Sequence, residues 1–149
     1  MRAVVQRVSS AKVESKGALL GEIGRGLLIL IGIEEDDTQK DIDYIVDKCA
    51  NLRIFDDEKS VMNVSALQSK CALLVVSQFT IMGDVRKGRR PSYIHAASPK
   101  IAQNVFRKTL EAFEGTGLPL QTGRFAADMQ VSLLNDGPVT ILMDSKRVF

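Results

Sequence analysis

The chain has 149 residues, of which 45% are apolar and 26% are charged, and its formal net charge is +2. A chain of about this length buries roughly two thirds of its unfolded surface, so the composition predicts one folded domain over residues 1–149 and excludes a disordered or collagen-like protein. The longest apolar run, residues 27–31, is far shorter than the roughly 20 residues that a membrane-spanning helix needs, which excludes such a helix.

The first part of the chain predicts strands. Arg2–Val8 and Ala11–Glu14 predict a first pair of strands. Lys16-Gly17 is a turn signal, and a further short strand is predicted at Leu19–Ile23. Gly26–Ile33 is nearly all apolar, which is typical of a strand covered on both faces.

A helix is predicted next. Thr38 and Asp41 have the spacing of a capping box, and apolar residues follow at helical spacing at Ile42, Ile45, Val46 and Cys49. Short extended segments are predicted at 52–55 and 61–64. A second fully apolar strand is predicted at Ala72–Phe79.

The last third predicts a second helix and the final strands. Ser98 as N-cap and Pro99 as first helical residue begin the helix, which ends near Gly115. Period-two alternation around Met129–Leu133, a turn at 135–137 and a strand at 139–143 complete the pattern. The order ββ, βα, βα, βββ predicts an α/β protein with mixed sheets and two helices.

The first candidate site is Ser77-Gln78-Phe79-Thr80, where polar residues follow an apolar strand. Ligands gather outside the carboxyl ends of strands in sheets that helices cover, because donors converge there while the rest of each strand is buried. The alternative is that these residues only begin a loop.

The second candidate is a basic segment that contains four nearby cations, Arg86, Lys87, Arg89 and Arg90. Such a group faces solvent or an anion, and beside the first candidate it is placed to contact phosphates of a nucleic acid. His95 lacks any recognisable triad partner, so we interpret it as structural or phosphate-contacting. Cys49 and Cys71 lack metal-ligand spacing, so we expect buried thiols and no metal.

The third candidate is Gly137-Pro138 within the segment Asn-Asp-Gly-Pro-Val-Thr. Asn-Asp-Gly alone predicts an ordinary hairpin turn. The proline removes a donor from the start of the last strand, and its peptide bond is of the kind that can be held cis. A fixed turn of this kind would present its carbonyl groups to a ligand in one direction.

These motifs together resemble the bacterial-type D-aminoacyl-tRNA deacylase family. The resemblance rests on the Ser77–Thr80 tetrapeptide, the residues around Arg90-Pro91-Ser92 and His95-Ala96-Ala97, and the run from Ala127 to Thr140. It also includes residues 1–9 and 51–58, so it extends over essentially the whole chain. Each tetrapeptide is weak alone, whereas the ordered set is specific.

The resemblance implies a homodimer of three-layer β/β/α domains that hydrolyses the ester between a D-amino acid, or glycine, and the terminal adenosine of tRNA. It implies that Gly137 and Pro138 of one subunit project into the pocket of the other, opposite Ser77, Gln78, Phe79 and Thr80. It further implies that Phe125 and Met129 bind the adenosine and shape the pocket, and we expect neither a cofactor nor DNA as a partner. Gln6 and Arg7 interrupt the apolar stretch that a signal peptide would need, so we expect a cytoplasmic protein without membrane association.

Physical chemistry agrees with this activity. The two enantiomers of an aminoacyl group differ only in geometry, so a catalyst that spares the L form must exclude its side chain sterically, and glycine would pass. Thr80 lacks an obvious base, so the resemblance favours attack assisted by the ribose 2′-hydroxyl, with backbone N–H groups near Phe79 and Thr80 stabilising the oxyanion. Two alternatives remain: an RNA-binding module without activity, and a threonine-dependent esterase or peptidase.

Overall fold

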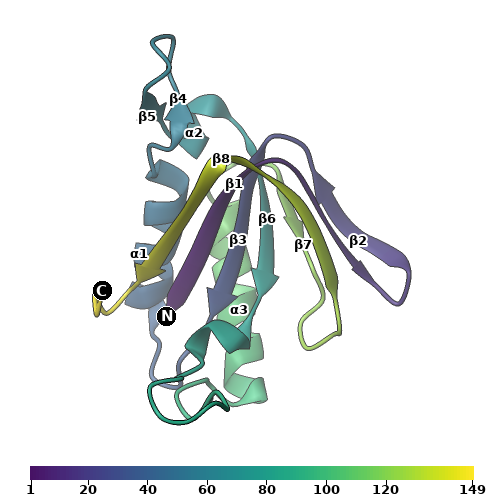
Figure 1. The fold of residues 1–149 in the computed structure, drawn as a ribbon, viewed down its shortest axis with the longest axis vertical. Helices are drawn as coiled ribbons and strands as arrows, with labels where there is room; N and C mark the ends of the chain where they lie inside the picture. Colours follow the sequence, from purple (N-terminus) through teal and green to yellow (C-terminus); the bar gives the residue numbers. More distant parts are fainter.

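Two long strands that pair with each other dominate the fold, which a computed structural model describes for all 149 residues (Figure 1). These strands are β1 (Arg2–Ser15) and β8 (Gln130–Asp144). The remaining strands are β2 (Ala18–Ile23), β3 (Gly26–Gly32), β4 (Phe55–Asp56), β5 (Met62–Val64), β6 (Ala72–Ser77) and β7 (Leu120–Thr122). The helices are α1 (Gln39–Asn51), α2 (Ala66–Ser69), the 3₁₀ turn η1 (Phe79–Met82) and α3 (Pro99–Glu114).

A mixed sheet of six strands forms the centre of the molecule. Its order is β2-β1-β3-β6-β7, and β8 pairs with β1. The pairs β3–β6 and β6–β7 are parallel, whereas β1 is antiparallel to β2, β3 and β8. The first half of β1 pairs with β3 and the second half with β2, so the bend in β1 turns the sheet back over itself.

Two apolar cores separate three layers, because alternate side chains of the central strands face opposite ways. Leu27 and Ile29 of β3 face a core that includes Ile45 of α1 and Phe113 of α3. Leu28 and Leu74 face a second core, against Val13 of β1 and Ile23 of β2. The predicted β/β/α arrangement is confirmed, with both long helices on one face of the sheet.

The predicted helix boundaries are confirmed, although one cap differs. Both the backbone N–H and the hydroxyl of Thr38 donate to Asp41, each at 2.8 Å, and the predicted apolar stripe of α1 is buried. α3 begins at Pro99 after Ser98, but the Ser98 side chain does not cap it. Instead the Ser98 backbone N–H donates to the Glu35 carboxylate at 2.7 Å, which ties the start of α3 to the loop after β3.

The strand predictions at both ends of the chain need correction. Residues 2–8 and 11–14 form one bent strand rather than a pair. The segment 135–137 is no hairpin turn, because β8 runs through it and both halves of β8 pair with β1. Val8 pairs with Asn135, and Gln6 pairs with Thr140. The chain therefore advances by two residues in β1 and by five residues in β8 between these two pairs, and the extra residues of β8 form a bulge.

The expectation of two helices also needs correction, since α2 and η1 add two short ones. In α2 the Gln68 N–H donates to the Ser65 hydroxyl and the Ser65 N–H donates to the Gln68 side chain. This capping box is visible in the sequence, but four helical residues are too few to show periodicity. The apolar strand ends at Ser77 instead of Phe79, because η1 begins at Phe79.

Both cysteines are free and buried, and burial raises the pKa of the Cys49 thiol and of the Cys71 thiol. This confirms the expectation of free, buried thiols. None of the helices combines the length and apolar character that crossing a bilayer requires.

Candidate active site

A cavity of about 730 Å³ opens at the carboxyl ends of the parallel strands β3 and β6. Ile31 and Val76 form its floor, and most of its lining is apolar. Its walls come from two loops, residues 93–99 before α3 and residues 125–129 before β8. A mostly apolar cavity with a few polar groups at a strand edge is the usual form of a small-ligand site.

Five residues that the sequence predicted for the site line this cavity together: Ser77, Gln78, Phe79, Phe125 and Met129. They come from segments about 50 residues apart, which the sheet brings together. Thr80 is exposed and does not line the cavity. Its hydroxyl accepts a hydrogen bond from the Gln78 side-chain amide and has no carboxylate or imidazole partner.

The loop before α3 contributes a wall that the sequence did not predict. Tyr93 lies edge-on to Phe79 with 5.1 Å between ring centroids, and both rings line the cavity. The Ala97 N–H donates to the Ile33 carbonyl at 2.9 Å, which fixes this wall against the end of β3. No local pattern indicates a contact between residues so far apart in the chain. His95 is exposed and does not line the cavity.

The polar chemistry of the cavity is sparse. Asp128 is the single charged residue in its lining. The backbone N–H groups of Phe79 and Thr80 stand at the start of η1, where the first turn of a helix leaves its own donors unused. The cavity can therefore hold an apolar or aromatic group and offer backbone donors at its edge, but it presents no side-chain base and nucleophile pair.

The basic segment forms a closed loop beside the cavity. Asp84 and Ser92 exchange two backbone hydrogen bonds at its base. Arg86 forms a salt bridge and hydrogen bonds with Asp84, and these hold the pKa of the Asp84 carboxyl well below its usual range. Lys87, Arg89 and Arg90 are exposed and make no salt bridge, so they are available to an anion.

Gly137 and Pro138 lie exposed in the bulge of β8, and the peptide bond between them is cis. The buried Arg7 side chain supports the bulge, since its Nε donates to the Asp136 carbonyl at 2.8 Å and its Nη1 to the Ile54 carbonyl at 2.6 Å. The Asn135 side chain accepts from the Val139 N–H at 2.7 Å and so closes the bulge from the other side.

The bulge and the cavity occupy opposite ends of the sheet. Arg7, which holds the bulge, pairs with Leu27 of β3, whereas Ser77 pairs with Ile31 of β3. Four residues of strand separate these positions, or about 13 Å, and β3 also lies between the strands that carry the two groups. Figure 1 shows the arch of β8 at the top and the segments after β3 and β6 at the bottom. Within one chain the structure does not bring Gly137 and Pro138 to the predicted site.

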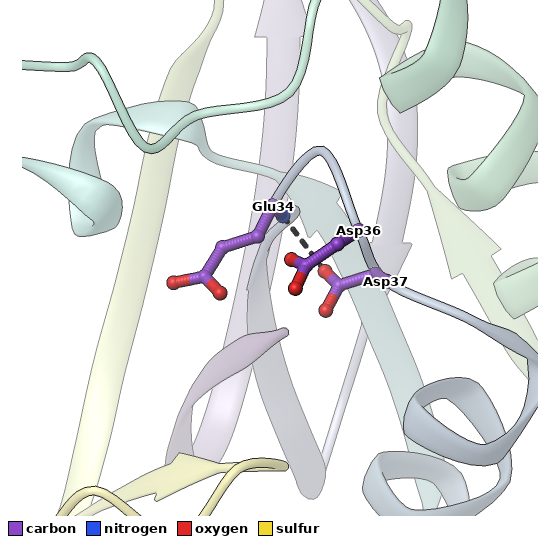
Figure 2. A group of neighbouring side chains, drawn as sticks. All are labelled: Glu34, Asp36 and Asp37. Atoms are coloured by element: carbon purple, nitrogen blue, oxygen red, sulfur yellow. Dashed lines mark hydrogen bonds between the residues drawn. The ribbon is translucent and has the colours of Figure 1, made fainter.

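A third group of polar side chains, Glu34, Asp36 and Asp37, lies in the loop after β3 (Figure 2). The Lys146 ammonium contacts both Glu34 and Asp36, and its hydrogen bond to Asp36 lowers the pKa of that carboxyl. The amine of Met1 donates to Asp37 at 2.5 Å, although burial raises the pKa of that carboxyl. The chain's own cations neutralise this cluster, which joins the loop to the start of β1 and to the residues that follow β8.

Comparison with known proteins identifies close relatives. Residues 4–144 match the family model described as D-Tyr-tRNA(Tyr) deacylase. Proteins named D-aminoacyl-tRNA deacylase from Thermosipho africanus and Clostridioides difficile are 54% and 52% identical, with each alignment covering all of both chains.

Two solved structures share the fold. One, described as c-Myc DNA unwinding element binding protein, is 40% identical with a TM-score of 0.91, covering 97% of this chain and 98% of that one. The other, described as a probable eukaryotic D-amino acid tRNA deacylase, has a TM-score of 0.81 at 15% identity, covering 95% of this chain and 97% of that one, and supports the fold alone.

The bulge requires glycine at position 137, which two substitutions can test. Gly137 has φ +136°, and an added Cβ would lie 2.8 Å from Val139 Cγ2 and 3.0 Å from Arg7 Nη2. Gly17 also has positive φ but nothing within 4 Å. We expect Gly17→Ala to lower the free energy of unfolding by about 1 kcal/mol, and Gly137→Ala by about 3 kcal/mol, because strain and crowding combine. Urea denaturation measures both, and equal losses would contradict crowding at the bulge.

Proposed function

Because the chain belongs to the D-Tyr-tRNA(Tyr) deacylase family, we propose that its cavity at the end of β6 releases D-amino acids from the terminal adenosine of tRNA. The protein is a hydrolase that acts on D-aminoacyl-tRNA, and the observation that carries this conclusion is full-length identity of about half with proteins of that name. We also propose that the protein acts in the cytoplasm, because its tRNA substrate is used there.

The terminal adenosine and the aminoacyl group share the cavity. Aromatic rings bind bases by stacking, and the cavity offers Phe79, Tyr93 and Phe125. Phe125 and Met129 hold the adenosine, which leaves the ester near Ser77, Gln78 and the start of η1. The volume of about 730 Å³ lies within the range of small-molecule sites and suits a nucleoside with an amino acid attached.

Chiral selection comes from the bulge of a second subunit. The chain's own Gly137 and Pro138 lie at the far end of the sheet from the cavity, so a homodimer is the arrangement that can bring the two together. Apolar side chains on β8 support such an interface, since Leu134 and Leu142 are 64% and 59% exposed. Arg7 and Asn135 brace the bulge, so an incoming L side chain would meet atoms that do not move aside.

Glycyl-tRNA is a second substrate of this site. The bulge selects by steric exclusion: it rejects a side chain in the L position of the α-carbon, but it does not bind a side chain in the D position. Glycine has no side chain, so the bulge would not reject it.

The hydrolysis proceeds without a covalent enzyme intermediate. Thr80 lies outside the cavity lining and its hydroxyl is bonded to Gln78 rather than to a base. The 2′-hydroxyl of the terminal ribose lies beside the ester in every aminoacyl-tRNA and helps to activate the water. Backbone N–H groups at the start of η1 stabilise the oxyanion, so positioning and preorganised donors supply the rate increase.

The basic loop contacts tRNA phosphates. Lys87, Arg89 and Arg90 are exposed beside the cavity and unpaired, whereas Arg86 serves chiefly to hold the loop through Asp84. Phosphate contacts weaken as salt increases, so neutralising the three free cations is expected to flatten the salt dependence of KM for tRNA. An unchanged slope would place the loop outside the interface.

A nucleic-acid-binding role without hydrolysis is the second candidate function. The exposed loop cations favour it, as does a relative that is 40% identical and described as binding a DNA unwinding element. Release of amino acid from tRNA separates the two functions, because a binding module would release none.

The direct test compares three substrates. Purified protein is expected to release D-tyrosine from D-tyrosyl-tRNA and glycine from glycyl-tRNA, and to leave L-tyrosyl-tRNA intact, because the bulge excludes only the L side chain. Acid-precipitable radiolabel remaining on tRNA measures the release. Equal rates for the D and L esters would contradict chiral exclusion, and no release from any ester would contradict the enzyme activity itself.

Mixed dimers test whether the bulge acts across subunits. Ala127→Trp is expected to fill the cavity, so its homodimer is inactive, and Gly137→Ala is expected to displace the bulge, so its homodimer cleaves L-tyrosyl-tRNA as well as the D ester. A heterodimer of the two has one open cavity, which faces the intact bulge of the other subunit. The heterodimer is therefore expected to cleave D-tyrosyl-tRNA at about half the wild-type rate and to spare the L ester, because one of its two sites is complete.

Purification of the heterodimer by two different affinity tags controls for exchange between subunits. A tagged heterodimer that cleaves L-tyrosyl-tRNA as fast as the D ester would contradict the cross-subunit site, as would a wild-type protein that sediments as a monomer.

Thr80→Ala tests the absence of a covalent step. We expect the variant to retain at least about a third of the wild-type kcat, because the hydroxyl neither lines the cavity nor has a base, whereas loss of a true nucleophile typically costs several orders of magnitude. Single-turnover assays with D-tyrosyl-tRNA measure the rate. A loss of a thousandfold in a folded variant, with an acyl-enzyme trapped in the wild type, would establish Thr80 as the nucleophile.

A further inference from the structure

A second cavity, of about 440 Å³, lies beside the first, between one face of α3 and residues 123–125. Phe125 lines both cavities. The first turn of α3 also separates them, because Pro99 and Ala102 line the first cavity whereas Lys100 and Gln103 line the second. The two cavities are therefore neighbours divided by one aromatic side chain and one helical turn.

The second cavity combines an apolar base with a polar, basic rim. Phe106 is buried beneath it and packs against Phe125 with 6.1 Å between ring centroids. Lys100, Gln103, Asn104 and Arg107 form the rim at helical spacing on one face of α3. This is the composition of sites that bind single-stranded nucleic acid, in which rings contact bases and cations contact the backbone.

Some polar side chains of the rim are bonded to other residues of α3, and others have no partner within the chain. Arg107 makes a salt bridge with Glu111 and donates to Asn104 at 3.0 Å, so it is fixed by its own helix. The side chains of Lys100 and Gln103 make no hydrogen bond or salt bridge within the chain. An ammonium and a primary amide are thus unpaired beside an aromatic surface. These groups can bind a phosphate and the edge of a base.

We propose that this groove binds the nucleotide that precedes the terminal adenosine of tRNA, with Lys100 contacting its phosphate and Gln103 its base. The inference rests on the proposed function, which places the adenosine against Phe125 in the first cavity. The RNA strand must leave that cavity, and the next nucleotide then meets the groove on the other side of Phe125. The basic loop is left to contact phosphates farther along the acceptor stem.

The test uses three esters of D-tyrosine that differ only in the attached RNA: adenosine, the dinucleotide cytidylyl-adenosine, and whole tRNA. Wild-type protein is expected to have a KM for the dinucleotide ester about tenfold below that for the adenosine ester, because only the dinucleotide reaches the groove. Lys100→Ala/Gln103→Ala is expected to remove this gain and to raise KM for tRNA by a similar factor. Its kcat and its KM for the adenosine ester are expected to stay within twofold of wild type.

Two control variants make the result specific. Lys108→Ala removes a lysine of the same helix that lines neither cavity, and it is expected to leave all three KM values unchanged. Lys87→Ala/Arg89→Ala in the loop is expected to weaken tRNA alone and to leave the dinucleotide unaffected. The groove variant should also lower the salt slope of log KM for the dinucleotide by about 0.7, the value for one phosphate contact in a single strand.

Three outcomes would overturn the proposal. The first is a wild-type KM that is the same for the dinucleotide ester and the adenosine ester. The second is a groove variant that raises KM for the adenosine ester as much as for the dinucleotide ester. The third is a groove variant that changes neither KM. Failure of the proposed function is separate and recognisable, because wild-type protein would then cleave none of the three esters.

Discussion

The pairing of β1 with β8 along most of their length determines where the functional parts of the molecule lie. Each strand crosses from one layer of the sheet to the other, and the bulge in β8 forms near the crossing. Buried Arg7 occupies that point and hydrogen-bonds to backbone on either side. Because the bulge is fixed there, it stands at the opposite end of the sheet from the cavity.

The cavity owes its character to the burial of β3 and β6 on both faces. Their side chains are apolar up to the last residue, so polar groups appear only where the strands end, at Ser77 and Gln78. Such a site is poor in acids and bases but rich in backbone donors and rings. That combination suits an ester that is already reactive, because such an ester needs positioning and exclusion more than it needs a strong base.

Two positively charged surfaces flank the cavity and differ in how they are built. The loop cations stand on a loop closed by Asp84 and Ser92, whereas Lys100 and Gln103 stand on a helix that packs on the core. A helix fixes side-chain positions more closely than a loop does, so the helical groove is suited to one defined nucleotide.

The sequence by itself determined the class of fold, the two long helices and the family, because each depends on local patterns. These patterns are the apolar runs of β3 and β6, the capping residue Thr38, the proline at the first position of α3 and the ordered motifs. It also identified five of the residues that line the cavity.

Only the tertiary structure decided that residues 135–137 are a bulge and not a hairpin, that Tyr93 and Ala97 form a wall of the cavity, and that the Thr80 side chain does not line it. The bulge depends on how β8 pairs with β1, and the wall depends on contacts with Phe79 and Ile33. A local pattern carries no information about such distant partners.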